Sequence, residues 1–158
     1  MSLKNNNDIE GIIIKKLVTH KDERGFFREI IRSTDDFFQA GFGQLSHSIV
    51  YHGIIKAWHL HKYQSQWTYV ASGTIKVALY DTRKNSDTHG QILEFIAGEN
   101  LDSFVYLFPP GVAHGYKCIN GPASVIYITS GQYDLDDELR IRYDDPEIGF
   151  DWLTESFK

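Results

Sequence analysis

Turn residues recur along the chain at short, regular intervals. They separate runs rich in β-branched and aromatic residues, and include Asn85, Gly90, Gly98, Pro109-Pro110-Gly111 and Asn120-Gly121-Pro122. Runs punctuated in this way are typical of strands joined by tight turns. About ten such runs predict an all-β antiparallel sandwich or barrel of the jelly-roll type. The expected strands are 11–18, 25–32, 44–51, 54–59, 67–71, 74–81, 91–97, 103–108, 114–119 and 123–130.

One of these turn signals predicts a hairpin. Ser72-Gly73 lies between the runs 67–71 and 74–81, and a Gly-containing dipeptide between two strand-like runs favours a tight reversal. The chain shows no internal repeat and no low-complexity linker. We therefore expect a single domain over 1–158, with a flexible start over 1–10.

One short helix is expected between the second and third runs. Ser33 or Thr34 can cap it, Asp35-Asp36 occupies its first turn, and Phe37-Phe38 supplies an apolar face. Gly41 ends the segment. The full fold-class prediction is therefore all-β with one or two short helices.

Composition excludes several classes of protein. The 158 residues carry a net charge of −5, which argues against binding to nucleic acid or to an anionic membrane. No apolar run approaches the roughly 20 residues that a membrane helix needs. The chain opens without the apolar stretch of a signal peptide, and its single cysteine, Cys118, fits a reducing compartment. We expect a cytoplasmic protein.

A histidine constellation in the middle of the chain carries the chemistry. His59 and His61 are two apart, so on a strand they share one face. Gln66 follows on the next run, and His114 follows a Pro-Pro-Gly turn. These four residues can bind a divalent transition metal. Without metal, three imidazoles can perform acid–base chemistry near neutral pH.

The spacing of this constellation resembles the cupin superfamily. The first cupin pattern is matched from Gly53 through His59, His61 and Gln66 to Gly73, with Gln66 where metal-binding members usually carry Glu. The second cupin pattern is matched over 109–114. The resemblance implies a jelly roll with a small-ligand site in its mouth.

A second resemblance covers nearly the whole chain, from about Gly11 to Trp152. The segments Asp22–Phe27, 81–90, Ala113–Gly115 and Asp144–Trp152 resemble the dTDP-4-dehydrorhamnose 3,5-epimerase family. This family's members are cupin jelly rolls, usually homodimers, that act on nucleotide-linked 4-keto-6-deoxy sugars without metal or other cofactor. The resemblance implies the same substrate class, with a role in rhamnose-type deoxysugar and polysaccharide biosynthesis.

The resemblance also assigns roles to single residues. His59 takes the position of the family's base and Tyr127 that of the opposing acid, while Tyr133 matches a second tyrosine that lines the site. Arg24 and Lys56 match basic positions that hold the nucleotide diphosphate.

Among the residues that the resemblance singles out for nucleotide binding, Phe26 is aromatic. It is expected to pack against the nucleotide or against a partner subunit.

The pocket departs from the family in three places. Gln66 stands where the epimerases have a catalytic lysine, and His61 stands where they usually have an amide. The family's C-terminal tail carries an acidic residue that orients the base, and we expect this partner to be missing here unless a local carboxylate replaces it. The run His59-Leu60-His61-Lys62 with Gln66 instead resembles the signature of nucleotide-sugar 3,4-ketoisomerases.

Three hypotheses follow from these observations. The first is a nucleotide-sugar epimerase, or alternatively a 3,4-ketoisomerase, in which His61, Gln66 and His114 shape the pocket. The second is a metal-binding cupin in which His59 joins those three residues as a ligand. The third is a non-catalytic module that binds a nucleotide sugar.

Overall fold

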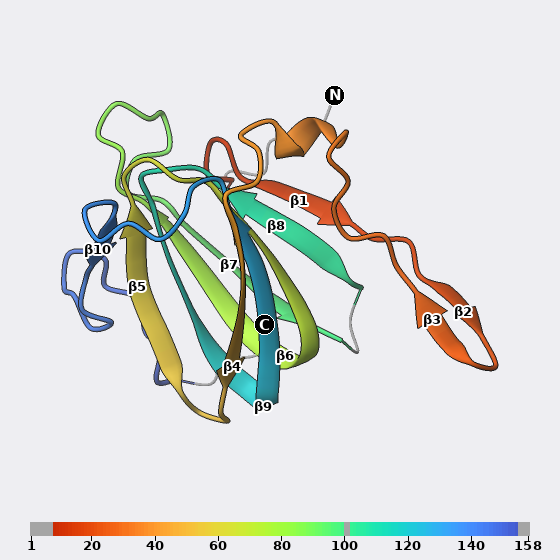
Figure 1. The fold of residues 1–158 in the computed structure, drawn as a ribbon. Helices are drawn as coiled ribbons and strands as arrows, with labels where there is room; N and C mark the ends of the chain where they lie inside the picture. Colours follow the sequence, from red (N-terminus) through yellow and green to blue (C-terminus); the bar gives the residue numbers. More distant parts are fainter. Residues whose placement is uncertain (1–7, 100–101, 155–158) are drawn as a thin grey trace.

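Two long strands, β6 (Gln66–Asp81) and β9 (Val112–Thr129), pair antiparallel along their whole length and run through both layers of the molecule (Figure 1). The structure is a computed structural model that describes residues 8–99 and 102–154. The remaining elements are β1 (Ile13–Lys16), β2 (His20–Asp22), β3 (Gly25–Phe27), the 3-10 helix η1 (Asp36–Phe38), β4 (Gln44–Val50), β5 (Ile55–His61), β7 (Ile92–Gly98), β8 (Phe104–Phe108) and β10 (Glu138–Arg140).

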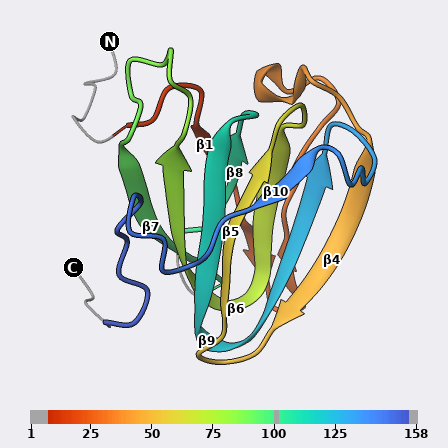
Figure 2. The same ribbon diagram turned by 90° about the vertical axis from the view of Figure 1, so that its left-hand side faces the viewer.

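The two halves of β6 and β9 belong to different layers. The second half of β6 pairs with β7, and the first half of β9 pairs with β5, which in turn pairs with β10. The first half of β6 pairs with β8, which pairs with β1, and the second half of β9 pairs with β4. All these pairs are antiparallel, and Figure 2 shows the two layers facing each other. The architecture confirms the predicted all-β jelly roll.

The predicted hairpin at Ser72-Gly73 is wrong. The chain does not reverse there; β6 continues through it, and register shifts between Val70 and Ile75 bend the strand. Gly73 has a φ of +73°, and a Cβ on it would lie 2.7 Å from the Ala123 Cα. Only glycine fits this bend, because it alone lacks a Cβ and adopts a positive φ without strain. The expected break at 120–122 is likewise wrong, because β9 continues through it.

The predicted helix is reduced to the three residues of η1. Neither Ser33 nor Thr34 caps it; Asp35 occupies the N-cap position, but its carboxylate accepts from the Arg32 N–H and the Lys15 ammonium instead. The apolar face was predicted correctly, since Phe38 is buried against Trp67 with ring centroids 4.6 Å apart. Among the described residues, no helix is long and apolar enough to cross a membrane.

The main core lies between the layers, and a second core lies outside them. Trp58 on the outer face of β5 packs against Trp152, with ring centroids 5.1 Å apart, and against Phe150. Trp58 and Ile141 also exchange two backbone hydrogen bonds. Together these contacts hold the segment that follows β10 against β5. The expected flexible start falls mainly on 1–7, outside the described residues, whereas Ile9 is buried in the main core.

A buried carboxylate organises the loop after β6. Asp81 is fully buried and accepts hydrogen bonds from Arg83, Ser86 and Thr88. Burial by itself raises the pKa of Asp81, but these donors outweigh it and hold the pKa well below the ordinary value. The ionised carboxylate is therefore part of the native state.

We predict that Asp81→Asn lowers the free energy of unfolding near neutral pH by about 3–5 kcal/mol, because it leaves buried donors without their charged acceptor. Because the native pKa is depressed, the wild-type advantage is present above about pH 4 and shrinks as the pH falls below it. Urea unfolding at several pH values measures both effects. Asp144→Asn, which removes an exposed carboxylate paired with Arg142, serves as the control and is expected to change little. Equal losses in the two variants would contradict the prediction.

Candidate active site

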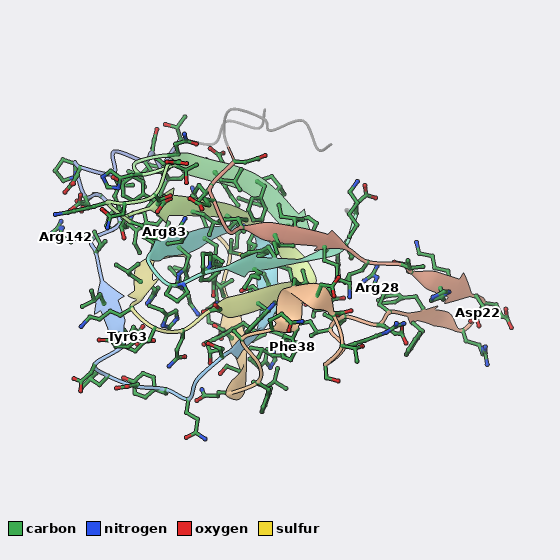
Figure 3. All side chains as sticks on the ribbon, turned by 90° about the horizontal axis from the view of Figure 1, so that it is seen from above. Asp22, Arg28, Phe38, Tyr63, Arg83 and Arg142 are labelled. Atoms are coloured by element: carbon green, nitrogen blue, oxygen red, sulfur yellow. The ribbon has the colours of Figure 1, made fainter. Side chains whose placement is uncertain are left out.

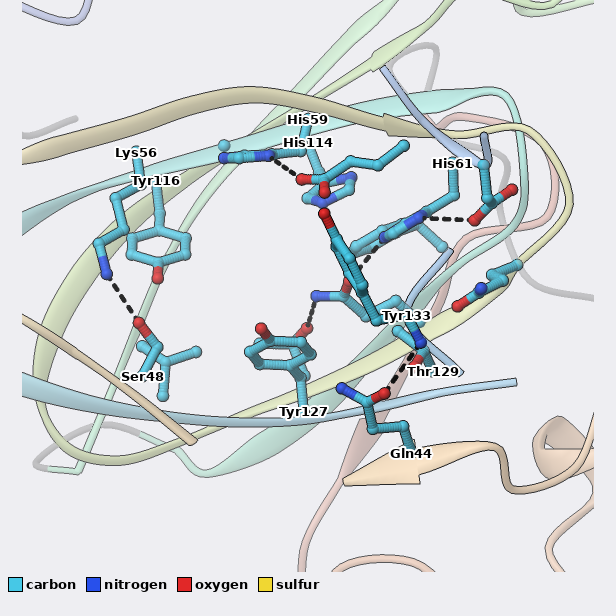
Figure 4. Close-up of a pocket in the computed structure, with 18 of the residues that line it drawn as sticks. Gln44, Ser48, Lys56, His59, His61, His114, Tyr116, Tyr127, Thr129 and Tyr133 are labelled. Atoms are coloured by element: carbon cyan, nitrogen blue, oxygen red, sulfur yellow. Dashed lines mark hydrogen bonds and ion pairs between the residues drawn. The ribbon is translucent and has the colours of Figure 1, made fainter. Parts of the chain in front are cut away.

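A cavity of about 320 Å³ opens between the two layers, within the range of small-molecule sites. Its walls come mainly from β4, β5, β6, β8, β9 and β10 and from the loop before β10 (Figure 4). The polar and charged lining residues are Gln44, Ser48, Lys56, His59, His61, Gln64, Gln66, Thr68, Tyr106, His114, Tyr116, Tyr127, Thr129, Tyr133, Asp134, Asp137, Glu138 and Arg140.

His59 forms a dyad with a carboxylate on the neighbouring strand. The Nδ1 atom of His59 lies 2.9 Å from Oε1 of Glu138. The alternation of β5 turns His59 into the cavity and Trp58 into the outer core. The family's acidic tail residue was expected to be missing unless a local carboxylate replaces it, and Glu138 is a local carboxylate in contact with His59. The contact directs Nε2, the other ring nitrogen, away from the carboxylate.

His61 forms a second dyad two residues further along the same strand. Its Nδ1 lies 3.0 Å from Oδ2 of Asp137, which is 1% exposed and also accepts from the Tyr63 backbone N–H. On the other side of the ring, Nε2 lies 3.3 Å from Oε1 of Gln66, whose amide nitrogen donates to Thr68. Asp137 and Gln66 both present an oxygen to the His61 ring, so both contacts are hydrogen bonds only when each ring nitrogen carries a hydrogen.

His114 completes the histidine group from β9. Its ring stacks on those of His59 and His61, with centroids 5.9 and 5.4 Å apart, and lies 4.2 Å from the ring of Phe108. Burial, together with the two neighbouring imidazoles, holds the pKa of His114 well below its ordinary value. His114 is accordingly neutral near neutral pH and forms an uncharged part of the wall.

The geometry does not fit the alternative of a metal site made by His59, His61, Gln66 and His114. Metal ligands must point their donor atoms at one position. In the part of the chain that the structure describes, no group of three or more His, Cys, Asp or Glu side chains is arranged to hold an ion.

The wall across from the histidines carries hydroxyl groups, and one end of the cavity carries an amine. Tyr127 projects from β9 into the cavity, and Figure 4 shows it across the cavity from His59. At one end, the Lys56 ammonium donates to the Ser48 hydroxyl at 2.7 Å. Burial raises the pKa of Tyr116, which also bonds Ser48. Of the residues assigned by resemblance, Lys56 and Tyr127 therefore share one cavity with His59.

Tyr133 lies at the mouth of the same cavity. It is 68% exposed, its backbone N–H donates to Oε1 of Gln44, and its ring reaches from the Gln44 side toward the histidine side (Figure 4). A planar, exposed aromatic ring in this position can cover a bound ligand.

Arg24 and Phe26 do not line the cavity of their own chain. Both lie on the β2–β3 hairpin, which projects away from the layered body (Figures 1 and 3). Phe26 is 58% exposed, and the Arg28 guanidinium lies over its ring, with Cζ 4.1 Å from the ring centroid. Arg28 also donates to the Tyr69 hydroxyl at the base of the hairpin. The single chain therefore leaves two of the assigned ligand-binding residues outside its cavity.

Several cavity residues were missed at the level of sequence. Glu138, Asp137 and Arg140 come from the acidic run before and within β10, a strand of three residues that gives no periodic signal. Gln44 and Ser48 alternate along β4 and could have been assigned to the cavity face from that alternation.

Fold and cavity together define a cupin-type jelly roll with a histidine- and tyrosine-lined site for a small molecule. A profile of the dTDP-4-dehydrorhamnose 3,5-epimerase family matches residues 6–158. The chain therefore belongs to this family of carbohydrate epimerases, and the predicted resemblance is confirmed.

Individual relatives agree with this assignment. The spore coat polysaccharide biosynthesis protein SpsL of Bacillus subtilis is 42% identical over 150 residues, covering 93% of this chain and 98% of the relative. The probable low-salt glycan biosynthesis epimerase Agl13 of Haloferax volcanii is 32% identical, covering 94% and 97%. The crystal structure of a dTDP sugar isomerase from Desulfovibrio desulfuricans superposes with a TM-score of 0.88 at 28% identity and covers 94% of each chain.

The depressed pKa of His114 makes stability depend on pH. In the unfolded chain this histidine takes up a proton near its ordinary pKa of about 6.5, whereas the folded state holds it neutral, so stability falls as the pH drops below that value. We predict that His114→Gln reduces this loss by up to about 1.4 kcal/mol per pH unit. Urea unfolding midpoints between about pH 7.5 and 5.5 measure it. The control is His20→Gln, at an exposed position; parallel pH curves for wild type and His114→Gln would contradict the prediction.

Proposed function

We propose that the protein epimerises a dTDP-4-keto-6-deoxyhexose, with His59 as the base and Tyr127 as the acid. The observation that carries the proposal is the His59–Glu138 dyad facing Tyr127 across one cavity. Relatives support the substrate class. A Methanothermobacter thermautotrophicus protein named dTDP-4-dehydrorhamnose 3,5-epimerase is 31% identical, covering 93% of this chain and 82% of the relative. The Legionella pneumophila enzyme, 26% identical, was crystallised with dTDP-4-keto-L-rhamnose.

The dyad gives His59 the features of a general base. A hydrogen on Nδ1 that is bonded to Glu138 leaves the lone pair of Nε2 to take a proton from a carbon beside the ketone. The carboxylate then stabilises the imidazolium that forms. Inversion requires a proton to return on the opposite face of that carbon, and the Tyr127 hydroxyl comes from the opposite wall.

The second dyad supports an alternative, the nucleotide-sugar 3,4-ketoisomerase. In that reaction a proton leaves one carbon and returns to its neighbour, and the carbonyl group moves. His61 lies two residues from His59 on the same face and has its own carboxylate, Asp137. The paired dyads would allow one histidine to remove the proton and the other to return it.

We predict that the protein incorporates deuterium beside the ketone of dTDP-4-keto-6-deoxyglucose in deuterated water, and that His59→Asn or Tyr127→Phe slows turnover by about 10²–10⁴-fold. Glu138→Gln, which keeps the shape but removes the charge behind His59, is expected to slow turnover by about 10²-fold. Proton NMR follows exchange at each carbon.

The pattern of exchange distinguishes the candidate functions. Exchange at both flanking carbons indicates 3,5-epimerisation, exchange at one carbon without movement of the ketone indicates a single epimerisation, and movement of the ketone indicates the ketoisomerase. Binding without exchange would indicate the non-catalytic module. Full activity of His59→Asn would refute the assignment of the base.

We further propose a homodimer in which the β2–β3 hairpin reaches the cavity of the partner subunit. The hairpin projects from the body, carries exposed Phe26 and Phe27, and presents Arg24, whose side chain is 82% exposed. An arginine and aromatic rings suit a nucleotide diphosphate, and none of these three side chains lines the cavity of its own chain. Because the cavity and the hairpin lie apart in one chain, two chains would complete each site.

We predict a dimer by light scattering and a loss of dTDP affinity of about tenfold in Arg24→Ala, equivalent to about 1.4 kcal/mol for one charged hydrogen bond. The matched control is Lys21→Ala, on the same hairpin, which removes the same charge. A monomer that binds dTDP with wild-type affinity, or equal affinity losses in the two variants, would contradict this arrangement.

The remaining expectations fit this function. We propose that the reaction needs no metal or other cofactor, since a positioned base and acid, His59 and Tyr127, can perform the proton transfers by themselves. We also propose a cytoplasmic protein, where a buried free thiol such as Cys118 stays reduced.

A further inference from the structure

The charges around the cavity are unevenly distributed. The loop before β10 and β10 itself place three carboxylates on the lining, those of Asp134, Asp137 and Glu138. Apart from the histidines, Lys56 and Arg140 are the cationic side chains on the lining formed by described residues. A nucleotide sugar brings a diphosphate with its own negative charge. Such a group is attracted by these two cations and repelled by the carboxylates.

Arg140 is placed on the cavity side of β10 by strand geometry. Glu138, two residues before it, faces the cavity and contacts His59, so Arg140 shares that face while Leu139 takes the other. In the ladder with β5, Arg140 lies opposite His59. Its side chain is 77% exposed and has one polar contact among the described residues, from Nε to Glu138 at 3.9 Å.

The register also places Arg140 toward Lys56. Because β10 runs antiparallel to β5, Glu138 lies opposite His61 and Arg140 lies opposite His59, one step nearer to the Lys56 end of β5. Lys56 and Arg140 thus lie on the same side of the His61–Asp137 dyad, toward the start of β5. The diphosphate could lie between them with the sugar over His59.

The donors of the two cations complement each other. The Lys56 ammonium already donates to the Ser48 hydroxyl and the Ile49 carbonyl, which leaves one of its three hydrogens. The Arg140 guanidinium has five N–H donors in a planar fork that matches two phosphate oxygens at once. Its long contact to Glu138 exceeds hydrogen-bond distance, so this fork stays available to a ligand.

We propose that Arg140 binds the diphosphate of the nucleotide-sugar substrate through its guanidinium fork, together with Lys56. The proposal rests on the proposed function and adds a residue to it. Arg140 is a binding residue, and the proton transfer remains with His59 and Tyr127.

The test is calorimetric binding of dTDP and of thymidine to the full chain. Arg140→Ala is expected to weaken dTDP binding about tenfold or more, since a charge-assisted hydrogen bond contributes about 1.5–3 kcal/mol. Arg140→Lys, which keeps the charge and loses the fork, should lie between wild type and Arg140→Ala. Thymidine, which lacks phosphate, should bind all three proteins equally.

Arg142→Ala is the matched control. This substitution removes the same charge two residues away, at a side chain that is 80% exposed, pairs with Asp144 and does not line the cavity (Figure 3). The variant should bind dTDP as the wild type does. Equal losses in Arg140→Ala and Arg142→Ala, an unchanged affinity in Arg140→Ala, or an equal loss for thymidine and dTDP would each overturn the proposal.

Failure of the proposal and failure of the proposed function can be told apart. A wild-type protein that binds dTDP in an Arg140-dependent way but exchanges no sugar proton would refute the enzyme and uphold the role of Arg140. If the wild type exchanges sugar protons and Arg140→Ala binds dTDP with unchanged affinity, the enzyme is upheld and the role of Arg140 is refuted. A wild-type protein without affinity for dTDP would refute both.

Discussion

The full-length pairing of β6 with β9 is the constraint on which the remaining structure depends. These two strands bend together at Gly73 and so belong to both layers, which closes the cavity on two sides. Every other strand of the main sheet attaches to this pair directly or through one neighbour. Because β6 carries Gln66 and Thr68, and β9 carries His114 and Tyr127, the same backbone ladder that fixes the layers also fixes part of the polar cavity wall.

The carboxylates that contact the histidines, those of Asp137 and Glu138, are positioned by β10 and by the segment that follows it. β10 has three residues and would not hold its place by its own ladder alone. The segment behind it is fixed by Trp58, Phe150 and Trp152 on the outer face of β5. Asp137 precedes the strand and Glu138 begins it, so strand alternation does not separate them and each reaches a different histidine. The aromatic residues on the outer face of β5 therefore help to position the carboxylates that contact the histidines on its inner face.

The sequence predicted most of the fold, because strand-like runs and turn residues are local signals. The prediction failed at Ser72-Gly73, because a glycine can either reverse the chain or bend a continuous strand. Here it bends β6, which remains paired with β9 on both sides of the bend. The sequence indicated cavity residues where two of them share a strand, as with His59 and His61, or where a resemblance named the residue, as with Tyr127, and the structure brings all three to one cavity. Asp137, Glu138 and Arg140 could not be predicted, since their place follows from the docking of a three-residue strand by distant tryptophans.

The alternation of β5 has a consequence for folding fidelity. His59 and His61 face the cavity while Trp58 and Leu60 face the outer core, so a shift of one residue in the pairing of β5 would exchange the two sets. Such a molecule would bury imidazoles among tryptophans and expose indole to the ligand, and it would lose its outer core and its chemistry together. The packing of Trp58 and Leu60 in the outer core therefore disfavours conformers in which β5 is paired out of register. Since such conformers would also lack the histidines of the site, specific activity after refolding measures the fraction of molecules in correct register.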